Sequence, residues 1–239
     1  MPWATDGDET TNSQGGLLVL GSANVDEALA GYYTKYDCSA ADINPIGGIN
    51  KRDLKAFLRW AGNRADADLC IPVLGRVADA APSAELTGAE GEQDDETDMG
   101  ISYAELADLG TLRKVEHCGP LSTFLRLRDQ WQGRTITPSV RATGGKAPKT
   151  HDEEVAQKVK DFFFRNAVHR HKMTTLTPSY HAEDYSPDDN RFDLRPFLHP
   201  ASFQVQFAAI DAAVAAAAKA SSTSTLPSVN GVGKKRQRM

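Results

Sequence analysis

A short, continuous apolar run at residues 17–20 (LLVL) most constrains how this chain can fold. The run ends at Gly21 and Ser22, and apolar residues then recur at helical spacing over residues 25–33, with Asn24 placed as an N-cap. A short run of this kind is typical of a strand that is buried on both faces of a parallel sheet. The pattern therefore predicts a parallel strand that passes directly into a helix.

Most of the remaining chain indicates helices. Apolar residues recur at helical spacing over residues 51–61 and 120–131, and an Ala-dominated helix is expected over residues 208–220. Capping boxes are predicted where Ser102 precedes Glu105 and where Thr150 precedes Glu153. A second short strand is expected at residues 71–74, where Pro72 restricts it to a sheet edge or a strand start.

Composition excludes several classes of protein. The 239 residues are 40% hydrophobic and 25% charged with a net charge of -5, which argues against a whole-surface affinity for nucleic acid or anionic membrane. No apolar run approaches the roughly 18 residues of a membrane span, and residues 1–16 lack the basic start and apolar stretch of a signal peptide. We therefore expect a cytoplasmic chain without membrane or nucleic-acid partners. The basic cluster at residues 234–238 leaves a nuclear address as an alternative.

Residues with ligand-binding chemistry gather around the first predicted helix. Ser22 lies in the turn before this helix and Glu27 in its first turn, where free amides favour an anion and a carboxylate suits Mg²⁺. Lys35 and Lys51 flank the long loop at residues 37–50 and could clamp phosphates. The alternatives are an ordinary strand-to-helix connection and solvated surface lysines.

Three more residues have the right chemistry for a ligand. Asp42 could accept hydrogen bonds from a ligand or could cap a turn. His171 and Lys172 follow an amphipathic helix and form either an anion contact or a solvated helix end. The six histidines show no paired metal-binding spacing, so no transition metal is expected.

Three segments together resemble the eukaryotic glutamine-dependent NAD synthetases: residues 21–27 (GSANVDE), residues 34–47 (TKYDCSAADINPIG) and residues 171–178 (HKMTTLTP). Further similarity lies at residues 95–106 and 185–197. The resemblance implies an α/β fold with an incomplete doubly wound, Rossmann-like parallel sheet of the adenine nucleotide alpha hydrolase type and a mostly helical C-terminal half.

The resemblance also implies an organisation along the chain. Residues 1–16 are expected to form a disordered leader, and residues 17–210 the C-terminal part of the NAD synthetase domain. Residues 133–149 are interpreted as an inserted loop within it, and residues 211–239 as an Ala-rich segment and a low-complexity basic tail.

The family's reaction is an ATP-dependent ligation. The resemblance implies that ATP and Mg²⁺ adenylylate the carboxylate of deamido-NAD, and that ammonia derived from glutamine then displaces AMP to give NAD. It also implies a homo-oligomer. No catalytic residue is assigned. The motifs imply ATP contacts at Ser22, Lys51 and Ser83, a Mg²⁺ ligand at Glu27, and deamido-NAD contacts at Lys35, Asp42, His171 and Lys172.

Two parts of the family's pattern are missing from this sequence. These are the pyrophosphatase loop, Ser-Gly-Gly-x-Asp-Ser, and the N-terminal glutaminase domain. We therefore expect that the isolated chain does not make NAD. The alternative is a noncatalytic, truncated paralogue or subunit that binds nucleotides or docks on a complete synthetase.

Overall fold

The computed structural model describes residues 16–32, 40–63, 71–80, 95–139, 148, 150–169, 171–172 and 200–223. Several predicted features lie partly or wholly outside these residues: residues 1–15 of the leader, residues 140–147 and 149 of the inserted loop, the similarity segments at 173–178 and 185–197, and the tail after residue 223. The described residues are mainly helical. Their helices are α1 (Val25–Ala30), α2 (Lys51–Gly62), α3 (Val73–Asp79), α4 (Asp95–Met99), α5 (Tyr103–Gly110), a π-helical turn (Thr111–Val115), α6 (Pro120–Gln130), α7 (His151–His169) and α8 (Gln204–Thr223).

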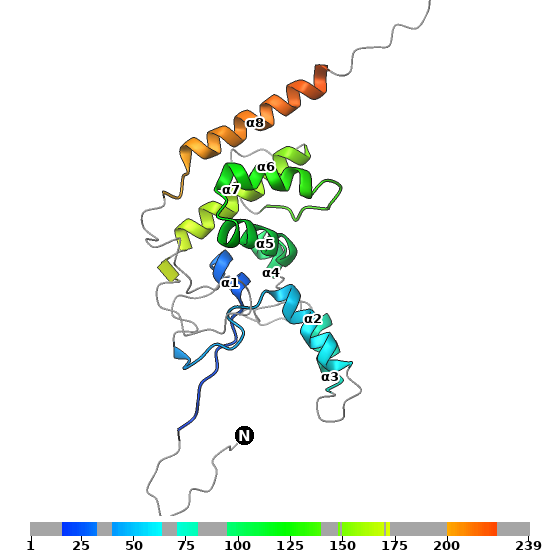
Figure 1. Cartoon of the computed structure of the whole chain (residues 1–239), viewed down its shortest axis with the longest axis vertical. Helices are drawn as coiled ribbons and strands as arrows, with labels where there is room; N and C mark the ends of the chain where they lie inside the picture. The colour runs from blue at the N-terminus through cyan, green and yellow to red at the C-terminus, as the bar shows by residue number, and fades with distance from the viewer. Residues whose placement is uncertain are drawn as a thin grey trace, which may run out of the picture.

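The core lies among the C-terminal helices. α6 packs against α7, α8 contacts both of them, and α1 contacts α5 and α7 from the other side (Figure 1). Phe124, Leu127, Trp131, Val155 and Val159 are almost completely buried there. Helices predominate in the described residues of the C-terminal half, as predicted. No helix in the described part of the chain is long and apolar enough to cross a membrane.

Both predicted capping boxes form. Ser102 Oγ accepts from the backbone N–H of Glu105 at 3.2 Å, and Glu105 Oε2 accepts from the N–H of Ser102 at 2.8 Å. Thr150 and Glu153 exchange the corresponding bonds at 3.3 and 3.2 Å. Because these bonds satisfy amides that have no partner inside the helix, they fix where α5 and α7 begin.

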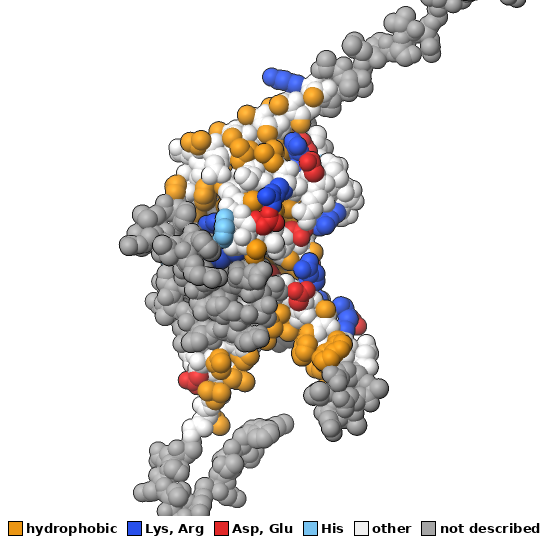
Figure 2. Space-filling view, viewed as in Figure 1, with side chains coloured by type: hydrophobic (Ala, Val, Ile, Leu, Met, Phe, Trp, Pro, Cys, Tyr) orange, Lys and Arg blue, Asp and Glu red, His pale blue; other side chains and the backbone are white. Residues whose placement is uncertain are grey.

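The run at residues 17–20 is extended but not buried. A single parallel bridge joins Leu20 to Ile43, supported by a 2.8 Å hydrogen bond from the Gly21 N–H to the Ile43 carbonyl. Exposure of the four side chains ranges from 50% at Val19 to 80% at Leu17, and apolar surface gathers along this segment below α1 (Figure 2). The prediction of a strand buried on both faces is wrong for the described residues, because no described element covers these four side chains.

The second predicted strand, at residues 71–74, is also wrong. α3 begins at Val73, directly after Pro72, whose φ of -58° suits the first turn of a helix. α3 packs against α2, and Arg59 Nη2 reaches Asp79 Oδ1 at 2.8 Å across the pair. A short apolar run beside a proline is compatible both with a strand and with the start of a helix, so the sequence pattern could not distinguish them.

Candidate functional site

The start of α1 is organised by Asn24. Its Oδ1 accepts from the backbone N–H groups of Asp26 at 2.9 Å and of Glu27 at 3.4 Å, and its Nδ2 donates to Glu27 Oε1 at 3.0 Å. The N-cap predicted from the sequence is therefore confirmed. Because the cap also binds the Glu27 side chain, it fixes the orientation of that carboxylate as well as the start of the helix.

The start of α2 lies against the start of α1. The backbone N–H of Lys51 donates to Asp26 Oδ2 at 2.6 Å, and the N–H of Val25 donates to the Ile49 carbonyl at 3.2 Å. Asn50 caps α2 by accepting from the N–H of Asp53 at 2.8 Å. The bond between Asp26 and Lys51 connects residues 25 positions apart and brings Lys51 beside the first turn of α1.

α4 and the start of α5 supply further side chains beside the starts of α1 and α2. The Tyr103 hydroxyl donates to Asp95 Oδ2 at 3.3 Å, and the Tyr103 backbone N–H donates to Glu96 Oε1 at 2.8 Å. Lys51 Nζ lies 5.4 Å from the centre of the Tyr103 ring, within the range of a cation–π contact. We call Asp26, Glu27, Asp95, Tyr103 and Lys51 the carboxylate cluster.

Charge in the carboxylate cluster is dominated by its acids. Burial raises the pKa of the Glu27 carboxyl to about 7; Lys51 and the Asn24 hydrogen bond oppose this rise, and Asp95 and Asp26 add to it. Burial, and then the charges of Asp95, Glu27 and Asp26, raise the pKa of the Tyr103 phenol well above its usual value. Asp95 and Asp26 thus add negative charge around Glu27, and Lys51 offsets part of it.

The carboxylate oxygens of the cluster are donors of the type that Mg²⁺ binds. Mg²⁺ takes hard oxygen ligands and is usually held by one or two carboxylates together with substrate phosphates. Within the described ranges, no group of three or more His, Cys, Asp or Glu side chains is arranged to hold a metal ion on its own. The Glu27 carboxylate offers one hard oxygen donor of the kind that Mg²⁺ takes.

The predicted site residues divide into two sets. Glu27 and Lys51 come together in the carboxylate cluster, and the exposed Ser22 lies two residues before the Asn24 cap. Lys172 lies at the other end of α1, where its Nζ donates to the Gly31 carbonyl at 2.8 Å. The neighbouring His171 is exposed, and its Nδ1 lies 2.9 Å from the Val168 carbonyl oxygen.

The remaining predicted residues do not lie in the carboxylate cluster as described. Asp42 Oδ2 accepts from the backbone N–H of Val19, 23 residues earlier, at 2.9 Å. This long-range bond is not the turn cap that the sequence offered as an alternative, and the ligand contact stays a prediction. Lys35 and Ser83 lie outside the described residues. The structure therefore brings two of the predicted ligand residues, Glu27 and Lys51, close together, and it ties Lys172 to the C-terminal end of α1 through the Gly31 carbonyl.

Sequence reasoning missed Asp95 and Tyr103 as members of the cluster, and it assigned no ligand-binding role to Asp26. The Ser102 cap located Tyr103 at the start of a helix, but no spacing in the sequence connects residues 95–103 with residues 26–27. Such contacts arise from packing of α1 against α5 and could not be found by periodicity.

Comparison with known proteins points to one family. Residues 10–119 match the NAD synthase family. The chain is 54% identical over 204 residues to a glutamine-dependent NAD(+) synthetase of Drosophila melanogaster, covering 84% of this chain and 24% of that protein. It is 52% identical over 200 residues to the glutamine-dependent NAD(+) synthetase of Saccharomyces cerevisiae, covering 83% of this chain and 25% of that protein. The chain thus spans about a quarter of the length of these curated relatives.

The fold is also similar to a solved structure. A glutamine-dependent NAD(+) synthetase from Cytophaga hutchinsonii superposes with a TM-score of 0.50 at 20% identity, covering 80% of this chain and 26% of that one. At this level of identity the likeness concerns the fold. It indicates that the helices described above are arranged as in part of that enzyme.

Proposed function

Because this chain matches the NAD synthase family through residues 10–119, we propose that it forms part of a site for ATP-dependent amidation of deamido-NAD. In the proposed reaction a carboxylate oxygen of deamido-NAD attacks the α-phosphorus of ATP and releases pyrophosphate. Ammonia derived from glutamine then attacks the acyl carbon, and AMP leaves. Activation is required because a carboxylate has no leaving group that ammonia can displace.

The carboxylate cluster is the observation that carries this proposal. It places the Glu27 carboxylate within Coulombic reach of Lys51, at the adjoining starts of α1 and α2. We assign Glu27 as the Mg²⁺ ligand and Lys51 as a phosphate contact. A bound Mg²⁺ would neutralise phosphate charge. The Asn24 hydrogen bond holds the Glu27 carboxylate in one orientation, and the Asp26 bond holds the start of α2 beside it.

The other substrate contacts are assigned from the family resemblance. We assign Ser22 and Ser83 to ATP, and Lys35, Asp42, His171 and Lys172 to deamido-NAD. The Lys172 bond to Gly31 supports this assignment because it ties the residues after α7 to the same six-residue helix that carries Glu27. The doubly wound parallel sheet is likewise part of the proposal, supported by the parallel bridge at Leu20 and by the structural likeness.

We expect the isolated chain to bind nucleotide without efficient turnover. Its sequence contains no Ser-Gly-Gly-x-Asp-Ser loop, which would supply much of the triphosphate contact. The second candidate function is therefore a noncatalytic subunit that binds nucleotides or a complete synthetase. Homo-oligomer formation, cytoplasmic or nuclear location and the absence of nucleic-acid partners stay predictions.

Calorimetric titration of the purified chain tests the proposal. ATP with Mg²⁺ should bind, and Lys51→Met should weaken binding about tenfold or more, as expected for loss of one charged contact. Lys55→Met removes a lysine one turn further along α2 and serves as the matched control. Glu27→Gln should abolish the Mg²⁺ dependence of ATP affinity while leaving deamido-NAD affinity unchanged. Equal effects of Lys51→Met and Lys55→Met would contradict the assignment.

A parallel assay addresses turnover. The purified chain is mixed with deamido-NAD, ATP, Mg²⁺ and ammonia, and NAD is measured. We expect binding without significant NAD formation. Turnover near that of an intact synthetase would show that the chain is a complete enzyme by itself, and absence of binding to either substrate would favour a noncatalytic subunit that docks on a complete synthetase.

A further inference from the structure

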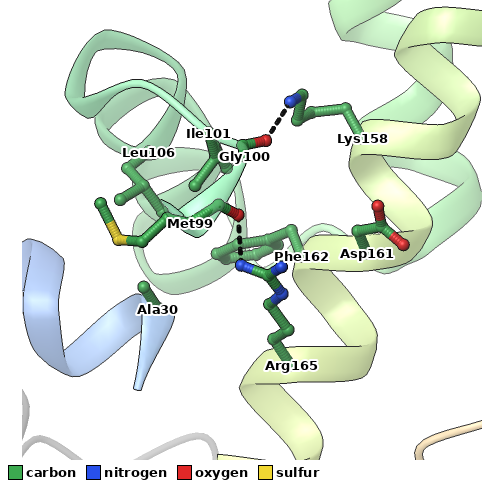
Figure 3. Close-up of a pocket in the computed structure, with 9 residues that line it drawn as sticks. All are labelled: Ala30, Met99, Gly100, Ile101, Leu106, Lys158, Asp161, Phe162 and Arg165. Carbon is green, nitrogen blue, oxygen red and sulfur yellow. Dashed lines mark hydrogen bonds between the residues drawn. The ribbon is translucent and has the colours of Figure 1, made fainter. Parts of the chain in front are cut away.

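Two basic side chains of α7 reach the turn between α4 and α5. Lys158, which is 1% exposed, donates from Nζ to the Gly100 carbonyl and, at 2.5 Å, to the Thr137 carbonyl. Arg165 Nη1 donates to the Met99 carbonyl. Figure 3 shows both side chains extending from α7 to the two consecutive carbonyls. The bonds leave the α4–α5 turn attached to α7 through its backbone.

This turn sets the relative placement of two parts of the carboxylate cluster. α4 carries Asp95 before the turn, and α5 begins at Tyr103 after it. Gly100 has a φ of 61°, a left-handed conformation that glycine adopts without strain. A small rotation of the backbone at this turn would therefore change the position of Tyr103 relative to α1.

Apolar packing alone does not fill the space between the turn and α7. A cavity of about 10 Å³ remains there, lined by residues that include Met99, Ile101, Lys158 and Phe162 (Figure 3). A gap of this size is at the lower limit for one water molecule, so the surrounding groups lack some packing contacts. The polar bonds from α7 therefore restrain the turn where side-chain packing is incomplete.

The cost of burying Lys158 indicates a role other than general stability. Its Nζ lies 3.8 Å from Glu105 Oε2, and burial lowers the pKa of the amine while the charges of Glu105 and Asp161 oppose that change. Buried ion pairs are often no more stabilising than apolar residues of similar size, but they impose a specific geometry. Here that geometry includes the Gly100 carbonyl of the turn.

We propose that Lys158 and Arg165 are positioning residues for the carboxylate cluster, acting through the carbonyls of Gly100 and Met99. Their importance for catalysis rests on the function proposed above, whereas their effect on the turn does not. Neither side chain belongs to the assigned substrate contacts. Because misplacement of a binding group by about 1 Å can reduce activity a hundredfold, restraint of the turn would matter to the site even at this distance.

Amide hydrogen exchange and ATP affinity test the proposal in the purified chain. Lys158→Met and Arg165→Met should each increase exchange at residues 101–106 about tenfold or more and weaken binding of ATP with Mg²⁺ by a similar factor. Arg165→Lys retains a donor and should restore both properties to within about threefold of the wild type. Lys160→Met is the matched control, because Lys160 lies on the same helix but pairs with Asp211 on α8.

Each result decides the question. The proposal is overturned if Lys158→Met and Lys160→Met lower the unfolding midpoint alike while exchange at residues 101–106 stays at the wild-type rate. It is also overturned if Arg165→Lys behaves like Arg165→Met. If the wild type does not bind ATP, the proposed function fails, and exchange alone then determines whether the two residues position the turn. If Lys158→Met does not fold, the Arg165 pair provides the same comparison.

Discussion

The Asp26 carboxylate accepts a 2.6 Å hydrogen bond from the backbone N–H of Lys51, and this bond places the first residue of α2 beside the first turn of α1. Asp26 is completely buried, so water cannot replace the bond. The contact fixes where the Lys51 side chain emerges relative to Glu27. It is therefore a structural precondition of the carboxylate cluster.

Removing this carboxylate should destabilise the chain. We expect Asp26→Ala to lower the free energy of unfolding by about 1–3 kcal/mol, because the Lys51 amide loses a buried acceptor. Asp26→Asn keeps an oxygen acceptor and should cost less. Urea denaturation measures both. Asp129→Ala, which removes a 75% exposed carboxylate, is the control and should change stability by under about 0.5 kcal/mol. Equal losses at the two positions would contradict the role of Asp26.

Stability should also depend on the protonation of Glu27. Its pKa is raised from 4.5 to about 7 by burial, so the folded chain keeps this proton over a pH range in which the unfolded chain releases it. The stabilising contribution is therefore complete below pH 4.5 and is lost as the pH rises through about 7. Glu27→Gln, which stays neutral, should flatten this part of the profile of unfolding free energy against pH.

The measurement is made by denaturation at several pH values without divalent cations. At a pH above the raised pKa of Glu27, the Glu27→Gln variant should be more stable than the wild type, because the folded variant does not carry the buried negative charge. An identical pH profile for both proteins would show that Glu27 has an ordinary pKa.

Two glycines should respond oppositely to substitution by alanine. Gly31 has a φ of 67°, and an added Cβ would overlap the Cβ of His169. Gly31→Ala should therefore cost more than the roughly 1 kcal/mol of the left-handed conformation alone. Gly75 lies within α3, where an added Cβ would meet nothing within 4 Å, so Gly75→Ala should stabilise the chain by about 0.5–1 kcal/mol.

Thermal unfolding of the two variants gives the comparison. Gly31→Ala should also weaken deamido-NAD binding if His171 and Lys172 contact this substrate, since both follow the displaced His169. A Gly31→Ala variant as stable as the wild type would mean that α7 does not approach α1 as closely as described.

The exposed run at residues 17–20 makes a further prediction. Leu18 is 69% exposed, so Leu18→Ser should change the free energy of unfolding by no more than about 0.5 kcal/mol. Leu109 is fully buried, and Leu109→Ala should cost about 2–5 kcal/mol. Chemical denaturation distinguishes the two cases. A large loss for Leu18→Ser would show that this run is buried in solution.

Local signals predicted the helices well. The caps at Asn24, Ser102 and Thr150 were all visible in the sequence, because capping depends on residues within one turn of each other. The two predicted strands failed in different ways. Residues 17–20 are extended, but their side chains are exposed, which the run itself cannot reveal. Residues 71–74 lead into α3, because a short apolar run has the same composition in a strand and at the start of a helix.

The candidate site was only partly predictable. Glu27 and Lys51 were identified through the family resemblance, and the structure brings them together. Asp95 and Tyr103 were not identified, because their proximity to Glu27 depends on how α1 packs against α5. A single sequence contains no direct record of that contact.

The length of α1 sets a fixed separation between two groups of functional residues. Its first turn is attached to α2 through Asp26, and the carbonyl of Gly31 at its other end is attached to Lys172. Inserting one residue would lengthen the helix by about 1.5 Å and rotate its far end by about 100°. The Gly31 carbonyl would then point away from Lys172, so evolution can vary the surface of this helix far more easily than its residue count.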